Sequence, residues 1–148
     1  MQPSIYISNI ILSNFRSHEK FTINSNSKNI VLFGKNGVGK TNILESISLL
    51  SPGRGLRNAK NEEIINKNTN TDYGLSANLQ FDNNSIKIKK TYLRDETKKS
   101  NLFIDDEKSK TADLLNYLRV IWVTPVMEKI MLQSNSERRN FFDRLIFN

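Results

Sequence analysis

The chain has 148 residues and no cysteine, which excludes a disulfide framework and a thiolate metal site. Its length suits one domain or one lobe of a larger protein. Lys and Arg number 22 against 15 acidic residues, a net charge of +7 that fits a polyanionic partner such as nucleotide or DNA, although a basic surface also serves solubility.

The first 21 residues, "MQPSIYISNIILSNFRSHEKF", alternate in character rather than forming one apolar run. They lack the charged n-region and cleavage site of a signal peptide, and they are too polar to cross a membrane. We therefore expect a strand over residues 4–12, a second strand starting at Lys20, and a cytoplasmic protein that makes no membrane contact.

A glycine-rich loop follows. In "IVLFGKNGVGKTNILESISLL", residues 30–50, the apolar residues 30–33 predict a short buried strand. The spacing of Ile43, Leu44, Ile47 and Leu50 predicts an amphipathic helix that begins near Lys40. Between the two, the chain fits the pattern G-x-x-x-x-G-K-[ST], and a strand and a helix on either side are the context in which that pattern binds phosphate.

The chemistry of such a loop is specific. Its glycines let successive backbone N–H groups point at phosphate oxygens, and the helix N-terminus adds partial positive charge. Lys40 is placed to reach the β and γ phosphates, and the Thr41 hydroxyl to bind Mg²⁺. The sequence thus predicts ATP and Mg²⁺ as cofactors, with Thr41 as the metal ligand. The predicted cofactor-binding residues of the loop are Gly34, Lys35, Asn36, Gly37, Val38, Gly39, Lys40 and Thr41.

The remaining elements alternate between short helices and strands. After a Pro/Gly turn at 51–56 we expect, in chain order, one or two helical turns at 61–66, a hairpin of strands 73–81 and 85–93, a strand at 101–104, a short helix at 111–118, a strand at 119–123, a brief helical stretch after Pro125, and a final helix. The capping-box pattern Ser134-x-x-Glu137 opens that last helix, which we expect to bury Phe141, Phe142, Leu145 and Ile146. This order predicts an α/β fold with an antiparallel flank.

The sequence offers the phosphate loop but no residue that can be assigned as catalytic. Hydrolysis usually needs an acid after a second buried strand, and "LFIDDE", residues 102–107, matches that pattern loosely. The lysines on both sides favour a solvated turn for Asp105, Asp106 and Glu107 instead. We also expect His18, the only histidine, to be solvated, and Trp122 to lie in the core.

The hairpin carries a candidate DNA surface. Lys87 and Lys89 alternate with Ile86 and Ile88, so they share one face, and Lys90 falls on the other side unless the strand bulges. Together with Lys98 and Lys99 these side chains suit phosphate contacts without base reading. A solvated strand face explains alternating lysines equally well.

Several segments together resemble a known family. "LSNFRSHEKF", "GKNGVGKTNILESISLL", "SPGRGLR" and "VIWVTPVMEKIMLQSNSERRNFFDRLIF" are similar, in this order, to the RecF family of bacterial recombination mediators, which are ABC-type ATPases of the chromosome-maintenance branch. The resemblance implies a P-loop ABC-type ATPase lobe, with a mixed sheet, an antiparallel flank and helices. It places residues 14–17, above all Arg16, near the adenine and its neighbouring phosphates. It also places a loop that senses the γ phosphate at 127–133, where Glu128 or Gln133 would act, while Asn42 either orients the phosphate loop or caps the helix.

The resemblance covers only about the first 40% of such a protein, judged by the usual size of two-domain chains. We therefore expect residues 1–134 to be an incomplete N-terminal ATP-binding lobe and 135–148 the start of a truncated helical domain. The family further implies DNA repair, replication and the SOS response, a parent that is a weak DNA-dependent ATPase, and a chain that is inactive alone. The implied partners are DNA, as duplex or single-strand/double-strand junctions, RecR and RecO-type mediators, and a second copy in an ATP-dependent homodimer. Two alternatives stay open, an unrelated small P-loop protein (a kinase or transport ATPase fragment) and a non-catalytic interaction module.

Overall fold

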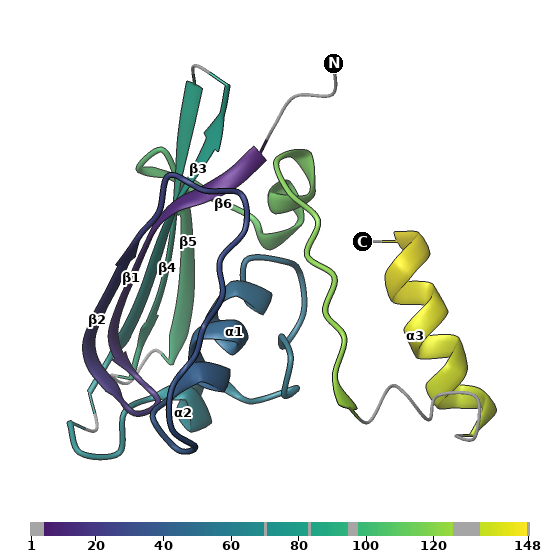
Figure 1. The fold of residues 1–148 in the computed structure, drawn as a ribbon, viewed down its shortest axis with the longest axis horizontal. Helices are drawn as coiled ribbons and strands as arrows, with labels where there is room; N and C mark the ends of the chain where they lie inside the picture. The colour runs from purple at the N-terminus through teal and green to yellow at the C-terminus, as the bar shows by residue number, and fades with distance from the viewer. Residues whose placement is uncertain (1–4, 70, 83, 95–97, 126–133, 148) are drawn as a thin grey trace.

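The computed structural model describes residues 5–69, 71–82, 84–94, 98–125 and 134–147. Its strands form one six-stranded sheet in the order β2-β1-β3-β4-β5-β6, shown in Figure 1. All five pairings between neighbouring strands are antiparallel. The strands are β1 (Ile5–Phe15), β2 (His18–Asn24), β3 (Tyr73–Phe81), β4 (Asn84–Leu93), β5 (Lys99–Ile104) and β6 (Glu107–Ser109). The predicted antiparallel flank therefore accounts for the whole described sheet.

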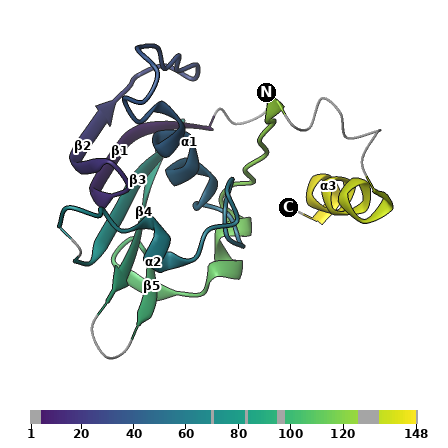
Figure 2. The ribbon, with the colours of Figure 1, turned by 90° about the horizontal axis from the view of Figure 1, so that it is seen from below.

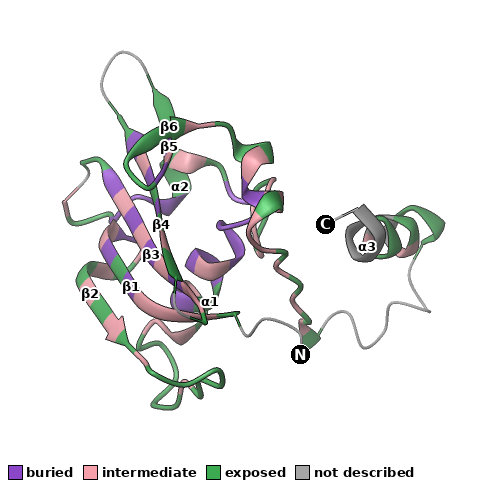
Figure 3. Cartoon of the chain, turned by 90° about the horizontal axis from the view of Figure 1, so that it is seen from above, coloured by how far each residue is buried: buried purple, intermediate pink, exposed green. Residues whose placement is uncertain are grey.

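Alternation of side chains determines which face of the sheet is buried. Along β3, Tyr73, Leu75, Ala77 and Leu79 are all buried, and the residues between them are only partly covered. Figure 3 shows this alternation as bands along the strand. Successive side chains of a strand point to opposite faces, so one face of the sheet packs on the core and the other faces solvent.

The helices lie against the apolar face. Helix α1 (Lys40–Ser48) lies on one side of the sheet in Figures 1 and 2, and the chain after it buries Leu49 and Leu50. Helix α2 (Asn61–Ile64) and the 3₁₀ helix η1 (Thr111–Asn116) add Ile64 and Leu114 to the same core. The predicted start of α1 at Lys40 is confirmed, whereas Leu44, expected to face inward, is 50% exposed.

Two predicted strands are wrong. Residues 30–33 and 119–123 have no strand structure, and Val31, Phe33 and Val123 are 82%, 91% and 77% exposed. An apolar run becomes a strand only where a neighbouring strand pairs its N–H and C=O groups, and among the described residues no such neighbour lies beside either segment.

The last helix, α3 (Asn135–Phe147), begins directly after Ser134, as the capping pattern predicts. The expectation of a buried apolar face fails at Phe142, which is 44% exposed, and the side chains of Leu145 and Ile146 are outside the described part. The helical stretch expected after Pro125 and the loop at 127–133, with Glu128 and Gln133, also lie outside the described residues. Within the described part, no helix is long and apolar enough to span a membrane.

Candidate nucleotide site

The glycine loop requires glycine at its last position. Gly37 and Gly39 have φ angles of 87° and 98°, a backbone region that side chains strongly disfavour, and α1 begins at the next residue, Lys40. A Cβ on Gly39 would lie 2.5 Å from His18 Nε2 and 2.8 Å from Ser17 Oγ. Both the backbone angle and the close approach of the His18 and Ser17 side chains therefore disfavour a larger residue at Gly39.

The side chain of Lys40 is bonded to the backbone of the loop. Its Nζ donates hydrogen bonds to the carbonyl oxygens of Gly34 and Lys35, both at 2.7 Å, so the ammonium lies across the loop. A cavity of about 200 Å³ adjoins it, lined by Asn36, Gly37, Gly39, Lys40, Thr41, Asn42 and Arg57. An ammonium group, a hydroxyl and a helix N-terminus around one small cavity fit a phosphate group with its Mg²⁺.

His18 is not simply solvated, as the sequence alone suggested. Its ring is half-buried and packs on Phe21 with 4.8 Å between ring centroids, and its Nε2 lies 3.3 Å from the carbonyl oxygen of Gly39. The start of β2 is therefore in direct contact with the end of the phosphate loop.

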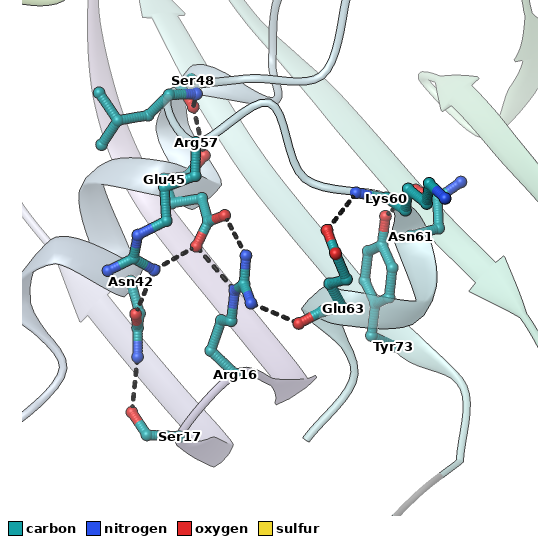
Figure 4. A network of polar contacts seen from close by, with 11 residues as sticks. Arg16, Ser17, Asn42, Glu45, Ser48, Arg57, Lys60, Asn61, Glu63 and Tyr73 are labelled. Atoms are coloured by element: carbon teal, nitrogen blue, oxygen red, sulfur yellow. Dashed lines mark hydrogen bonds and ion pairs between the residues drawn. The ribbon is translucent and has the colours of Figure 1, made fainter. Parts of the chain in front are cut away.

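A buried carboxylate joins the loop helix to its surroundings, as Figure 4 shows. The side chain of Glu45 is 0% exposed and accepts hydrogen bonds from Arg16 Nε at 2.9 Å and Arg16 Nη2 at 2.6 Å. Arg57 Nη1 donates to the same carboxylate at 2.7 Å. Two guanidinium groups around one carboxylate supply the charge-assisted bonds that a buried anion needs.

Asn42 extends this network toward the turn between β1 and β2. Its Oδ1 accepts a hydrogen bond from Arg57 at 2.8 Å, and its Nδ2 donates to Ser17 Oγ at 2.8 Å. The residue at the N-cap position is Gly39, and no side chain caps the helix. Asn42 thus connects α1 to the 16–18 turn and does not act as a helix cap.

Arg16 precedes Ser17, which lies beside Gly39 of the loop, and its guanidinium is engaged with protein groups. Besides Glu45 it donates to the carbonyl oxygen of Glu63. It also lines a cavity of about 460 Å³ that shares Asn42 and Arg57 with the cavity of the phosphate loop. The proximity of Arg16 to a bound nucleotide remains a prediction.

Sequence reasoning missed the parts played by Glu45 and Arg57. No local signal pointed to Glu45, because it lies two residues from both Ile43 and Ile47 and so falls on the other side of an amphipathic helix from them. A buried carboxylate also requires cationic partners. The sequence does not indicate which of the many basic residues those partners are.

Asp105 and Asp106 form the predicted turn between β5 and β6, and Glu107, also expected in the turn, is the first residue of β6. Asp105 and Asp106 have φ angles of 50° and 64°, Asp105 Oδ1 accepts a bond from the Lys87 backbone N–H, and Asp106 forms an exposed ion pair with Lys87 Nζ at 3.1 Å. Among the described residues, no three or more His, Cys, Asp or Glu side chains are grouped so that they could hold a metal ion.

Two further predicted roles are resolved. Trp122 is only half-buried and belongs to no strand; it lines a cavity of about 410 Å³ with Leu44 and Ile47, so its assignment to the sheet core is corrected. On β4, Lys87 and Lys89 are exposed as expected, and Lys90 points to the opposite, buried side.

A glycine loop at the start of a helix, beside an antiparallel sheet, defines the nucleotide-binding half of an ABC-type ATPase lobe. The chain belongs to the RecF/RecN/SMC N terminal domain family, whose model matches residues 6–126. This finding confirms the resemblance seen in the motifs.

Individual relatives agree with this assignment. The chain is 36% identical to the DNA replication and repair protein RecF of Rhizobium rhizogenes strain K84, over 99% of its own length and 40% of that protein. It is 32% identical to the protein of the same name from Rickettsia akari, over 98% of its length and 40% of that protein. The chain thus spans about 40% of the length of these curated relatives.

Solved structures give the same answer for the fold. The recombination mediator protein RecF in its ATP form superposes with a TM-score of 0.82 and 26% identity, over 97% of this chain and 39% of that one. An SMC ATPase gives a TM-score of 0.63 at 20% identity, over 95% of this chain and 99% of that one, and shows the shared fold.

Proposed function

We propose that this chain is the ATP-binding lobe of a RecF-like DNA replication and repair protein. The observation that carries the proposal is the Lys40 ammonium held across a glycine loop at the start of α1, beside a cavity lined by Thr41. The match to a RecF structure in its ATP form supports ATP as the nucleotide. It also makes an unrelated kinase or transport fragment the less favoured alternative.

Each loop group has a distinct task in this proposal. The backbone N–H groups of residues 34–41 and the N-terminus of α1 bind phosphate oxygens. Lys40 leaves the carbonyl oxygens of Gly34 and Lys35 and binds the β and γ phosphates, which offer a stronger, charged acceptor. Thr41 contributes its hydroxyl to Mg²⁺, whose remaining ligands are phosphate oxygens and water.

The network around Glu45 would hold this site in shape. It fixes Arg57 beside the loop cavity and Arg16 beside the adjoining one. A nucleotide bound at the loop meets cations whose positions are already set by the protein, so little side-chain ordering is needed on binding.

The wider activity follows from the family. In our proposal the full-length protein is a weak DNA-dependent ATPase that dimerises around ATP and works with RecR and RecO-type mediators in the cytoplasm. Residues 1–134 form its ATP-binding lobe, and residues 135–148 begin its helical domain. The chain alone is inactive, because none of its described carboxylates lies at the phosphate loop as a catalytic acid would.

DNA would contact the solvent-facing side of the sheet. Lys87 and Lys89 are exposed on β4. Lys99 on β5 is exposed too, and it pairs with Leu93, two residues after Thr91 on β4. Lys90 is buried and is not part of this surface, which corrects its inclusion among the DNA-contacting candidates. Lysines of this kind bind phosphates regardless of base sequence.

Calorimetric titration of the 148-residue chain with Mg-ATP tests the proposal. Lys40→Ala should weaken binding by about tenfold or more, since it removes a charge-assisted contact to phosphate. Lys28→Ala, at an exposed lysine away from the loop, is the matched control and should bind as the parent chain does. Equal affinity in the Lys40 and Lys28 variants would reject the assignment and favour the non-catalytic interaction module.

A further inference from the structure

A second cavity, separate from the phosphate loop, contains a buried lysine. Lys90 lies on the inward face of β4 between Ile88 and Tyr92, and it is only 8% exposed. Its Nζ donates one long hydrogen bond, 3.5 Å, to the carbonyl oxygen of Leu49, and among the described residues no carboxylate forms an ion pair with it. Burial of an ammonium group that makes one long hydrogen bond and no ion pair costs free energy, and a bound anion would offset that cost.

The cavity itself has a volume of about 700 Å³ and lies between α2, the turn at 52–54 and the inward face of β4 and β5. Lys90 lines it from the sheet, and three further cations, Arg54, Lys60 and Lys110, line it from other elements. The hydroxyls of Ser100 and Thr111 add neutral hydrogen-bond donors. None of the residues lining this cavity lines that of the phosphate loop, so the two sites are distinct.

The one described acid that lines the cavity already has partners. Glu62 Oε1 accepts a hydrogen bond from the Tyr92 hydroxyl at 3.0 Å. Its own backbone N–H and that hydroxyl lower the pKa of Glu62, so it remains ionised at neutral pH. Four cations against one satisfied carboxylate leave a clear excess of positive charge in the cavity lining.

The charge and the donors together select a ligand class. A small apolar ligand would leave the ammonium of Lys90 unsatisfied, and a metal cation would be repelled. A phosphate group offers several oxygens and up to two negative charges, which matches cations that converge from different elements. The volume of the cavity exceeds that of a phosphate group alone, so the rest of a larger molecule has room beside it.

We propose that this cavity is a second anion site, which binds a phosphate group through Lys90 with Arg54, Lys60 and Lys110. The phosphate is that of a free phosphate compound or of a DNA strand. Burial lowers the pKa of Lys90, and a bound anion would reverse this effect by stabilising the charged amine. The site therefore couples anion binding to the protonation of one lysine.

The experiment uses the Lys40→Ala chain, in which the phosphate loop no longer competes for phosphate. Inorganic phosphate, a 5′-phosphorylated oligonucleotide and its 5′-hydroxyl counterpart are titrated separately, and the thermal midpoint and the ¹⁵Nζ signal of Lys90 are recorded. We expect a rise in the midpoint and a shift of the Lys90 signal with at least one phosphate ligand. A response to inorganic phosphate identifies a free-phosphate site, and a response confined to oligonucleotides identifies a DNA-phosphate site.

Three additional substitutions make the result specific. Lys90→Met in the same background should reduce phosphate affinity by about tenfold or more, whereas Lys20→Met, at an exposed lysine of β2 that does not line the cavity, should leave it unchanged. Lys60→Gln, a change at the rim that leaves the core intact, should weaken binding to a smaller degree. The proposal is overturned if none of the three ligands shifts the Lys90 signal, or if Lys90→Met and Lys20→Met bind phosphate equally. Because failure here leaves ATP binding at the loop untouched, it is distinguishable from failure of the proposed function.

Discussion

Replacing Glu45 with Gln tests whether the buried network holds the loop helix in place. The substitution keeps the shape of the side chain but removes the charge that two guanidinium groups share. Arg16 and Arg57 then remain close together without their common anion, so both lose charge-assisted bonds and repel each other.

The magnitude follows from the burial of the three groups. Breaking a fully buried ion pair costs roughly 3–5 kcal/mol because it leaves an uncompensated charge. Here Glu45 is 0% exposed, but the side chains of Arg16 and Arg57 are 21% and 40% exposed, so water can solvate both arginines in part. We therefore expect Glu45→Gln to lower the free energy of unfolding by about 2–3 kcal/mol, below the full value for a buried pair.

Urea denaturation followed by circular dichroism measures this loss. Asp106→Asn is the matched control, since it breaks the ion pair with Lys87, in which the two side chains are 46% and 72% exposed. That control should change the free energy of unfolding by less than about 1 kcal/mol. Equal effects of the two substitutions would refute the view that the Glu45 network stabilises the fold.

Three further substitutions have clear expected outcomes. Gly39→Ala should abolish ATP binding in calorimetry, because its Cβ would collide with His18 and Ser17 at a strained backbone angle; unchanged affinity would show that the loop adapts. Lys90→Met should raise the free energy of unfolding at neutral pH. Burial lowers the pKa of Lys90, so the folded chain binds fewer protons than the unfolded chain, and the stability of the parent rises with pH toward 10.5. The difference in free energy of unfolding between the variant and the parent should therefore become smaller in urea titrations at increasing pH. A difference that does not change with pH would contradict burial of the charged Lys90 amine as its cause. In the full-length protein, replacing Lys87 and Lys89 with Gln should weaken binding to all DNA sequences alike and flatten its salt dependence, as measured by fluorescence anisotropy; an unchanged slope would place the DNA surface elsewhere.

Five of the six antiparallel strands were predictable from the sequence, because each of them pairs with a neighbour along the chain. β6 (Glu107–Ser109) was not predicted, since its three polar residues show no strand pattern. The hairpin of β3 and β4, the position of Lys87 and Lys89, and the turn at Asp105 and Asp106 all follow from period-two alternation and turn chemistry. The strands predicted at residues 30–33 and 119–123 were wrong for the opposite reason. Their composition suits a strand, but pairing depends on a partner that local sequence does not specify.

The candidate site likewise has a part that was predictable from local sequence and a part that was not. The phosphate loop was predictable, because its glycines, lysine and threonine act through local backbone geometry. The contacts of Glu45 with Arg16 and Arg57 join positions 29 and 12 residues apart, and the burial of Lys90 depends on how the Leu49 region packs on β4. Such contacts are set by tertiary packing, which no local pattern encodes.

The most direct test of the central claim is to map amide chemical shifts on the ¹⁵N-labelled chain during titration with Mg-ADP. The nucleotide should move the signals of residues 34–42 most strongly, because their N–H groups and the start of α1 surround the phosphates. The same titration of Lys40→Ala should leave those signals in place. Large shifts confined to other residues, or identical shifts in the parent and the Lys40 variant, would contradict nucleotide binding at the loop.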